Sequence, residues 1–548
     1  MSFIDITTNN MSRQLRNSNT YLDNWVYVPG PAITGEWKKP VALRSLDEFQ
    51  KTFGTQGQDG TLTYEYASGI LSAGLPVLFR RIAYVNQENV TDDLIEQYEE
   101  NKLPQGVSAP VGVRRAKYYS TTSADAGTDA PKQFKIVEKY GGSFGNNISV
   151  SLIKEDNDTQ YFIEVYVGKA LNQRVKICTI PSSVFDPVTK VIDPIKRNQI
   201  IITGLTKLKL NLVDVKVYET DPRNFVFTPV GKKALSGGVD IDDKLIRNEI
   251  VNSLDFIEDK ILYQPKFVTS GGFTDDNTTI STDKAIGKKL LAFTKKRQDC
   301  RALIDLPIGI LPKDQQGFAQ NYVYQQNSDA ELIPSGSVCA PWQYMQVGNE
   351  QLWMPPSYAY LTVVGSDLSK GRRAYTPKAG IYSGRVANII RPEFEIGSTL
   401  SEKWQTDGTP NINPIMKLQS GSYVIAGNST LLQTSTDGNE INAFAESSAD
   451  LTIIEIRRFV YNLATELQYQ YNGTTAFETF SLRTAKFLNT MASEGAVTDY
   501  NIINVSTDDD PRTLKVQLDV YLTPTIKKIE IYLNVAYGSI EVSTGGVR

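Results

Sequence analysis

The sequence predicts a multidomain protein that combines α/β and all-β regions, and three observations support this fold class. The chain has 548 residues, enough for roughly three to four domains of about 150 residues each. Strand-like and helix-like segments alternate near the N-terminus and again after residue 391, as in mixed α/β layers. Between them, strand-like segments follow one another at short spacing, as in a β-sandwich or small barrel.

The N-terminal globular region, residues 21–83, is expected to hold three strands and two helices. The segments WVYVPG, PVALRS and LPVLFRRIAY are typical of strands because they are short and rich in β-branched or aromatic residues. SLDEFQKTFG predicts a capped helix, with Ser45 as the N-cap, Glu48 at the capping-box position and Gly54 beyond the end. YEYASGILSAG predicts the second helix.

The polar segment STTSADAGTDAP, residues 120–131, is expected to be a linker into an all-β region. Strands are expected in QFKIVEKYGGSFGNNISVSLIK, TQYFIEVYVG, QRVKICTI, NQIIITG and FVFTPVG. The glycine-rich KYGGSFGNN could cradle a phosphate, but it leads into a strand rather than a helix, so a structural turn is favoured. Further on, DKAIGKKLLAFTKKRQDC predicts a helix and RALIDLPIG a buried strand.

The C-terminal region, from residue 391, is expected to combine two helices with two strands. Leu451 to Ile456 is interpreted as a strand that enters a helix, whose buried face carries Val460, Leu463, Ala464 and Leu467. A second helix, ended by Gly495, carries Phe480, Phe487, Leu488 and Met491. TLKVQLDVYL predicts a strand, and the apolar–polar alternation from Ile529 to Tyr537 predicts its partner.

Both ends of the chain carry a short alternating segment. The N-terminal one contains Phe3, Ile4 and Ile6, and the C-terminal one, after Gly538, contains Ile540 and Val542. A strand this close to a chain end has few residues to pair with, and an unpaired strand edge is a template for another chain. These segments are therefore either loose ends or strands that dock elsewhere.

The composition argues against several classes of function. A net charge of −4 disfavours a general nucleic-acid-binding protein, and no run approaches the ~18 apolar residues of a membrane span. The N-terminus has no apolar core, so we expect no signal peptide, and the three distant cysteines suit a reducing cytoplasm. The absence of histidine excludes Ser-His-Asp and Cys-His catalysis, and no phosphate-loop motif is present. We expect no enzymatic activity, no metal and no cofactor.

Two groups of basic residues are candidates for contacts with other proteins. Six cations and no acid lie in one short stretch: Lys370, Arg372, Arg373, Lys378, Arg385 and Arg391. They are interpreted either as a solvated strip or as a contact with an acidic partner surface. Arg457 and Arg458 form the second group. They are interpreted either as a contact with another protein or as a solvent-exposed pair that contributes little to stability.

Two further charged features have plain structural interpretations. Asp367 lies near Trp342 and Trp353 in the sequence, which allows a carbohydrate cleft, but buried aromatic residues beside solvated charges are favoured. The acidic run Asp508–Asp510 before a proline predicts an exposed turn.

Several stretches, in order along nearly the whole chain, resemble the contractile-tail sheath family of tailed bacteriophages and related injection machines. GEWKKPVALRSLDEFQKTFG followed by SAGLPVLFRRI resembles the N-terminal pattern of that family, and EKYGGSFGNNISVSL is similar to its Gly-x-x-Gly-Asn turn. SGSVCAPWQYMQVGNEQLWMPPSYAYLTVVGSDLSKGRRAYTPKAG resembles the middle region, and NINPIMKLQSGSYVIAGNSTL with IIEIRRFVYNL the C-terminal pattern. The chain departs from the pattern between FAQNYVYQQ and DAELIPSGS, and at Ala426, where many relatives have a tryptophan.

The resemblance implies a mixed α/β inner assembly domain built from both chain ends, with one or more inserted β-rich outer domains. The expected parts are an N-terminal arm (1–20), the first part of the α/β domain (21–95), an inserted β-rich domain (96–240), a middle α/β domain (241–390), a C-terminal assembly domain (391–537) and a C-terminal arm (538–548).

The resemblance also implies a structural subunit that polymerises helically around a tail tube and contracts to drive the tube through the host envelope. The expected partners are other copies of the chain, the tube protein and the baseplate and terminator proteins, without direct nucleic-acid contact or membrane insertion. The expected location is the virion tail, after assembly in the host cytoplasm. The terminal segments would then join neighbouring subunits, and Arg457 and Arg458 would face the tube.

Two alternatives stay open at this stage. The sheath could belong to a tailocin or a type VI-like injection system. A more distant alternative is a β-rich particle protein that binds or cleaves glycans, which would need paired carboxylates in a cleft.

Overall fold

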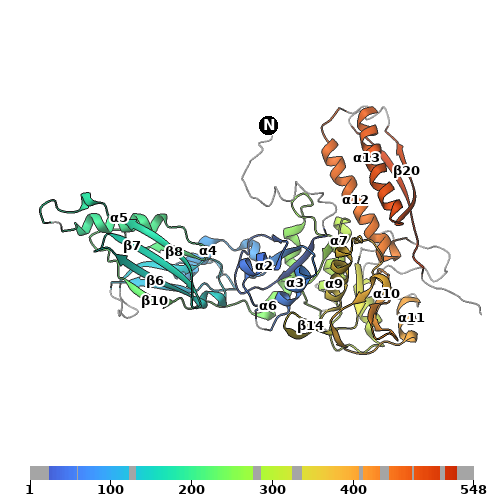
Figure 1. Ribbon diagram of the computed structural model, residues 1–548, viewed down its shortest axis with the longest axis horizontal. Helices are drawn as coiled ribbons and strands as arrows, with labels where there is room; N and C mark the ends of the chain where they lie inside the picture. The colour runs from blue at the N-terminus through green and yellow to red at the C-terminus, as the bar shows by residue number, and fades with distance from the viewer. Residues whose placement is uncertain are drawn as a thin grey trace, which may run out of the picture.

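The computed structural model describes residues 24–58, 60–122, 131–189, 191–275, 285–323, 336–406, 411–431, 443–471, 474–506 and 513–526. Figure 1 shows an elongated molecule, with β-sheets at one end, a central α/β body, and two long helices with a β-hairpin at the other end. The described residues form 12 α-helices and several sheets, which confirms the predicted mixture of α/β and all-β structure.

A nine-stranded sheet forms the centre of the body. In spatial order its strands are β16 (Arg385–Val386), β19 (Tyr423–Ile425), β18 (Ile412–Lys417), β13 (Gly336–Ala340), β12 (Arg301–Ile304), β11 (Phe267–Val268), β1 (Val26–Gly30), β3 (Val77–Arg81) and β2 (Val41–Leu43). The strands from β18 to β3 are parallel, and antiparallel strands close both edges.

Alternate residues of the parallel strands enter two different hydrophobic cores. Val26 and Val28 of β1 are fully buried in one core, whereas Tyr27 between them is buried in the other. The first core receives α2 (Leu46–Phe53), α3 (Thr63–Ser72) and α9 (Pro356–Ser369). The second core receives α4 (Asp92–Glu99), α6 (Asp243–Asn252), α7 (Ile286–Arg297), α8 (Gln315–Val323) and α11 (Ser398–Thr406). Burial on both faces explains why these strands are nearly continuous apolar runs.

The predicted capping of α2 is confirmed. The Ser45 hydroxyl accepts a hydrogen bond from the Glu48 backbone N–H at 3.2 Å. The Glu48 carboxylate reaches back to the backbone N–H of Arg44, at 2.8 Å, which is one residue before the N-cap. Gly54 ends the helix with a φ of 97°, a conformation that favours glycine.

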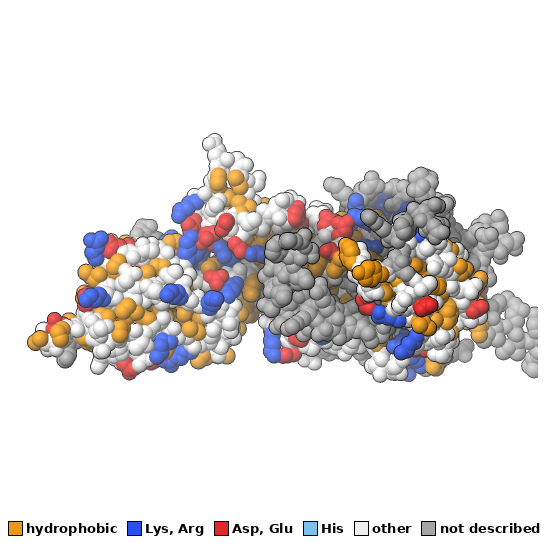
Figure 2. All heavy atoms as spheres, turned by 90° about the horizontal axis from the view of Figure 1, so that it is seen from above, with side chains coloured by type: hydrophobic (Ala, Val, Ile, Leu, Met, Phe, Trp, Pro, Cys, Tyr) orange, Lys and Arg blue, Asp and Glu red, His pale blue; other side chains and the backbone are white. Residues whose placement is uncertain are grey.

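Two outer sheets form the β-rich end of the molecule. One contains β10 (Val230–Ala234), β6 (Ile148–Glu155), β7 (Gln160–Val167) and β8 (Ala170–Thr179), and the other β4 (Lys117–Thr121), β5 (Lys132–Glu138) and β9 (Val213–Val217). They share one buried core with α5 (Pro194–Lys207). Figure 2 shows acidic and basic side chains intermixed over this end, so the face in view carries no extended field of one sign.

The prediction of an all-β segment here is wrong in part, because NQIIITG lies within α5. The Asp193 carboxylate caps that helix by accepting from the Ile195 and Lys196 N–H groups, and Pro194 occupies its first turn. This N-cap and proline override the β propensity of the isoleucine run. The FVFTPVG segment is also not a strand over most of its length, since β10 begins only at Val230.

The two connections between this end and the body lie side by side, and we call them the neck. Arg114 pairs with Val239 in an antiparallel bridge where the chain leaves and returns. The buried Arg81 guanidinium, at the end of β3, donates to the carbonyls of Tyr140 and Gly141 at 2.9 and 2.6 Å. The KYGGSFGNN stretch therefore serves as a structural turn at the neck, as favoured from the sequence.

Three smaller elements complete the fold. The strands β15 (Glu350–Met354), β14 (Gln343–Val347) and β17 (Ile389–Pro392) form a three-stranded sheet. In the chain, α9 and α10 (Gly380–Ser383) lie between β15 and β17. The far end contains α12 (Ser447–Leu467), α13 (Thr474–Ser493) and a hairpin of β20 (Val497–Asn504) and β21 (Val516–Leu522). The helix carrying Phe480 to Met491 and the TLKVQLDVYL strand are confirmed, whereas β20 was not predicted.

The expected strand at Leu451–Ile456 is wrong, because α12 is one continuous helix. Its first turns are buried almost all around, and buried polar residues such as Asp450 and Glu455 interrupt the apolar pattern. The apolar residues therefore show no clear 3.6-residue period in the sequence, and the β-branched isoleucines favour the prediction of a strand.

Candidate functional site

Helix α12 is held against the body by a buried arginine at the start of β12. The Arg301 guanidinium, which is fully buried, donates to the Ser447 carbonyl at 2.8 Å and to the Ser447 hydroxyl at 2.6 Å. It also lies 3.5 Å from the Asp450 carboxylate. The first turn of α12 is thus fixed to the central sheet.

A second buried ion pair fixes the middle of the helix. The Lys266 ammonium, just before β11, lies 2.6 Å from the Glu455 carboxylate, and both side chains are at most 3% exposed. Lys266 also donates to the Asn24 side chain at 2.6 Å. Because a buried charge is costly without its partner, this pair fixes α12 in one position.

The structure places Arg457 and Arg458 within α12 and gives them different surroundings. Arg458 is 2% exposed and donates to the Gln264 carbonyl at 2.8 Å, and its burial lowers the pKa of its guanidinium. Arg457 is half-buried, and it donates to the Gln298 carbonyl at 3.4 Å and lies over the Phe444 ring. Arg457 is therefore the member of this pair that a second protein can reach.

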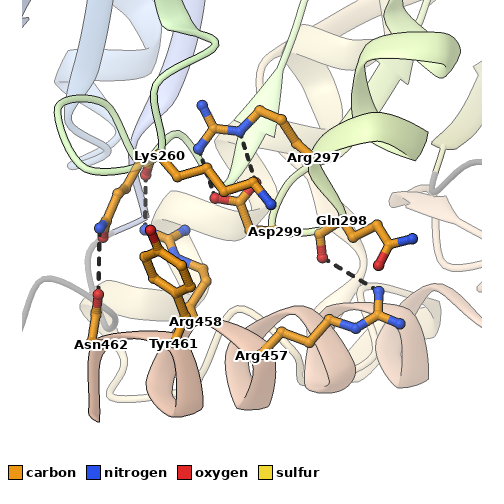
Figure 3. A pocket seen from close by; sticks show the side chains of 9 residues that line it. Lys260, Arg297, Gln298, Asp299, Arg457, Arg458, Tyr461 and Asn462 are labelled. Carbon is orange, nitrogen blue, oxygen red and sulfur yellow. Dashed lines mark hydrogen bonds and ion pairs between the residues drawn. The ribbon is translucent and has the colours of Figure 1, made fainter. Parts of the chain in front are cut away.

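A cavity of about 250 Å³ lies between α12 and the loop that follows α7. Its lining residues are Lys260, Gln264, Arg297, Gln298, Asp299, Arg457, Arg458, Tyr461 and Asn462. In Figure 3 the Arg297 guanidinium faces the Asp299 carboxylate above the cavity, while Arg457 and Tyr461 project into it from α12. We call this cavity the basic pocket.

Sequence reasoning missed most of the basic pocket. Lys260, Gln298 and Asp299 come from loops more than 150 residues before Arg457, and nothing in their local sequence links them to α12. The one available signal was the Arg457–Arg458 pair itself.

The six cations between Lys370 and Arg391 do not form one exposed strip. The Asp367 carboxylate binds Lys378 at 2.8 Å and Arg372 at 2.9 Å, and Lys378 is only 2% exposed. Burial lowers the pKa of the Lys378 ammonium. Lys378 therefore belongs to an internal ion pair and cannot contact a partner surface in this conformation.

The other members of this group lie nearer the surface. Arg373 binds Glu494 at 2.9 Å, which ties the end of α13 to the body. Arg391 lies over the rings of Tyr344 and Trp353, 5.4 and 5.1 Å from their centroids. Lys370 and Arg385 are also exposed.

The possible carbohydrate cleft is not supported by the described residues. Asp367 is buried and already paired with two cations, so its carboxylate is not available to a ligand. Trp342 is 6% exposed and donates its indole N–H to the Leu306 carbonyl at 2.7 Å. Buried aromatic residues therefore account for this region, as favoured from the sequence.

The β20–β21 hairpin has two outer edges that pair with no other strand among the described residues. Alternate residues such as Ile502 and Val516 pack towards α12 and α13, so one face of the hairpin is covered. The predicted arm residues Phe3, Ile4, Ile6, Ile540 and Val542, and the predicted strand Ile529–Tyr537, lie outside the described residues.

The described residues offer neither a metal site built from His, Cys, Asp and Glu side chains nor a membrane-spanning helix. No group of three or more His, Cys, Asp and Glu side chains in these ranges could hold a metal ion. No helix within them is both long and apolar enough for a membrane span.

This chain is similar to several proteins of known structure. No family model matches the chain, and no curated protein matches it. The crystal structure of a sheath tail protein from Listeria innocua matches with a TM-score of 0.59 and 12% identity, over 94% of this chain and 95% of that chain. A sheath tail protein from Desulfitobacterium hafniense matches with a TM-score of 0.55 and 12% identity, over 92% and 93%. A chain of the anti-feeding prophage baseplate in the contracted state matches with a TM-score of 0.48, at 13% identity over 95% of both chains.

Proposed function

Since this chain has the fold of the tail sheath proteins, we propose that it is the structural subunit of a contractile sheath. The observation that carries the proposal is a likeness that extends over 94% of this chain and 95% of the Listeria innocua sheath tail protein. In the proposed particle, many copies wind around a tail tube between a baseplate and a terminator. Contraction of this helix then drives the tube through a host envelope during genome delivery.

Assembly of such a helix needs two different surfaces on each subunit, because a heterologous contact generates an open filament. The proposed joint is the β20–β21 hairpin, whose outer edges can accept further strands. A two-stranded sheet is marginal alone, so added strands would stabilise it. We propose that Ile529–Tyr537 of the same chain extends it first, and that the two arms then come from neighbouring subunits.

The arms are tested by deletion. Each main-chain hydrogen bond across the joint contributes about 0.5–1.5 kcal/mol, so loss of one arm removes several kcal/mol from each contact. Variants that lack only residues 2–10 or only residues 539–548 are expected to remain folded by circular dichroism but to stay unassembled. Ordered polymers from either truncated chain would exclude strand exchange as the link.

Contraction without nucleotide hydrolysis requires two packings of one subunit that differ modestly in free energy. A difference of about 1 kcal/mol per subunit already changes the equilibrium fivefold, and a cooperative lattice multiplies it. The contacts with the tube must also release, which suits accessible charges better than buried ones. Of the two α12 arginines proposed to face the tube, Arg457 fits this requirement, while Arg458 holds α12 on the body.

The proposed function is tested by negative-stain microscopy of the purified chain over a range of concentrations. Rods, rings or hollow tubes of regular width are expected. A monodisperse monomer at every concentration that also turns over glycans would replace this proposal with the particle-enzyme alternative.

A further inference from the structure

The basic pocket holds more positive charge than its own residues neutralise. Four of its lining side chains are cationic, and Asp299 is the one carboxylate among them. That carboxylate is already bound by Arg297 through two hydrogen bonds of 2.8 and 2.6 Å. Lys260 and Arg457 form no ion pair within the described part of the chain, in a protein whose net charge is −4. The pocket is thus a local cationic site on an acidic protein.

Burial strengthens the attraction of these arginine side chains for a carboxylate. Desolvation lowers the pKa of the guanidinium of both Arg457 and Arg458, so each charged form loses hydration in this conformation. A carboxylate placed among them would restore the lost stabilisation, since charge pairs are stronger away from water. The volume of about 250 Å³ accommodates a carboxylate side chain together with several waters, each of which occupies about 30 Å³.

Exposed apolar and aromatic side chains accompany the charged lining of the pocket. Tyr461 lines the pocket and is 43% exposed, and Ile261 and Leu262, which follow the lining residue Lys260 in the sequence, are 64% and 54% exposed. A charged centre beside exposed apolar side chains fits a protein segment that carries acidic residues better than it fits a free ion.

The sequence of this same protein contains a complementary segment. Asp508, Asp509 and Asp510 lie outside the described residues, and in the sequence they stand between β20, which ends at Asn504, and β21, which begins at Val516. The start of β20 is next to the body, because Glu494 binds Arg373 and Tyr375 just before it. The described residues on either side of this segment, Ser506 and Lys515, therefore lie at the end of the hairpin that points away from the body.

Within one chain, the hairpin lies on another side of α12. Ile502 of β20 packs against the cluster that Phe459 and Leu463 of α12 form with Phe480 of α13. Phe459 is two positions from both Arg457 and Tyr461, about 160° around the helix from each. The pocket and the hairpin thus occupy different surfaces of the subunit, which is the arrangement that a head-to-tail contact requires.

We propose that the basic pocket binds the acidic connection, Asp508–Asp510, of a second copy of this chain. This inference rests on the proposed helical assembly and adds a second, electrostatic contact to the strand joint. It assigns Lys260 and Arg457 as the accessible cations, with Arg458 and Arg297 as the buried charges behind them, and it therefore gives Arg457 to the contact between subunits instead of the tube.

The test is a charge exchange in the full-length chain. One variant carries Lys260→Glu and Arg457→Glu, a second carries lysine at all three aspartates, and a third combines both sets. The critical concentration for polymerisation is measured by sedimentation. Each separate set is expected to raise it about tenfold or more, the effect of roughly 1.4 kcal/mol per contact, and the combined variant should return to within about threefold of wild type.

Controls separate folding and net charge from the contact itself. Lys207→Glu with Lys209→Glu reverses two exposed charges at the far β-rich end and should leave the critical concentration unchanged. Lys260→Ala with Arg457→Ala is a milder form of the pocket variant, and circular dichroism should find every variant folded. A second readout is zero-length amine–carboxylate cross-linking in a mixture of isotopically light and heavy chains, which should link Lys260 of one chain to the aspartates of another.

Three results would overturn the inference. One is normal polymerisation of the three-aspartate variant, and another is a combined variant that assembles no better than either half. The third is a pocket variant that polymerises freely but fails only on the tube, which would make the tube the occupant. Wild-type chains that form no polymer at all would instead contradict the proposed function, and the cross-link between light and heavy chains would then be absent.

Discussion

A buried aspartate at the junction of β12 and α9 leads to an unusual expectation about stability and pH. Asp305 is 4% exposed, and its carboxylate accepts hydrogen bonds from the Ser357 backbone N–H at 2.8 Å and from the Ser357 hydroxyl at 2.5 Å. Burial nevertheless outweighs these hydrogen bonds and raises the pKa of Asp305 from its ordinary value of 3.8 to about 6. The folded chain therefore holds this proton more tightly than the unfolded chain does.

The sign and size of the effect follow from this difference in pKa. A raised folded pKa contributes stability that is fully present below about pH 4 and is lost as the pH rises through about 6. About two pKa units correspond to about 3 kcal/mol, so the ionised carboxylate lowers the free energy of unfolding by about that amount at neutral pH. Asp305→Asn keeps an oxygen that can accept the Ser357 N–H but removes the charge. The variant should match wild type at pH 4 and exceed it by up to about 3 kcal/mol at pH 7.5.

Hydrogen exchange in urea, read on peptides that cover α9, measures this locally and does not require the whole chain to unfold in one step. Wild type and Asp305→Asn are compared at pH values from 4 to 7.5. Glu478→Gln, which removes an exposed carboxylate on α13, serves as the matched control and should give no pH-dependent difference. An Asp305→Asn chain that is less stable than wild type at pH 7.5, or a difference that does not change with pH, would refute the reasoning.

Two further predictions concern packing. Lys266→Met leaves the Glu455 carboxylate buried without the Lys266 cation, so it should destabilise the docking of α12 by about 3–5 kcal/mol, measured as faster hydrogen exchange in that helix. Adding Glu455→Leu should recover most of this loss. If it recovers nothing, the ion-pair explanation is contradicted. Gly365→Ala would place a methyl group 2.3 Å from the Ala73 carbonyl oxygen, so it should lower the free energy of unfolding in urea by about 1–3 kcal/mol. In the control Gly317→Ala the added methyl group meets nothing within 4 Å, so this variant should be neutral or stabilised by up to about 1 kcal/mol. Equal effects of the two substitutions would exclude the steric explanation.

Local signals in the sequence predict local structure well. The α2 helix could be placed to the residue because its N-cap, capping box and terminal glycine are all encoded within ten positions. The same kind of signal, Asp193 followed by Pro194, was present before α5 and would have corrected the false strand there. The β20 strand carries polar residues on its exposed face and a short apolar set on the other, so its alternation is weak.

Contacts between distant segments could not be read from the sequence. Lys378 appears as one of six clustered cations, yet the fold buries it against Asp367, eleven positions earlier. Arg457 and Arg458 are neighbours in sequence, but the helix turns only one of them fully into the body. The basic pocket depends on loops that meet α12 only in the folded chain, so periodicity and composition carry no trace of it.

The neck has a consequence for how the β-rich end can vary. The chain crosses out of and back into the body at one place, where Arg114 and Val239 pair, and the sheet strands before and after this excursion, β3 and β11, both pair with β1. Residues 116–236 are nevertheless tied to the body by specific groups at the neck: the Tyr140 and Gly141 carbonyls accept hydrogen bonds from the buried Arg81, and Lys135 and Lys216 lie against carboxylates of α4. A different outer fold introduced at this point would have to supply equivalent acceptors and cations, because the buried Arg81 would otherwise lose two of its acceptors.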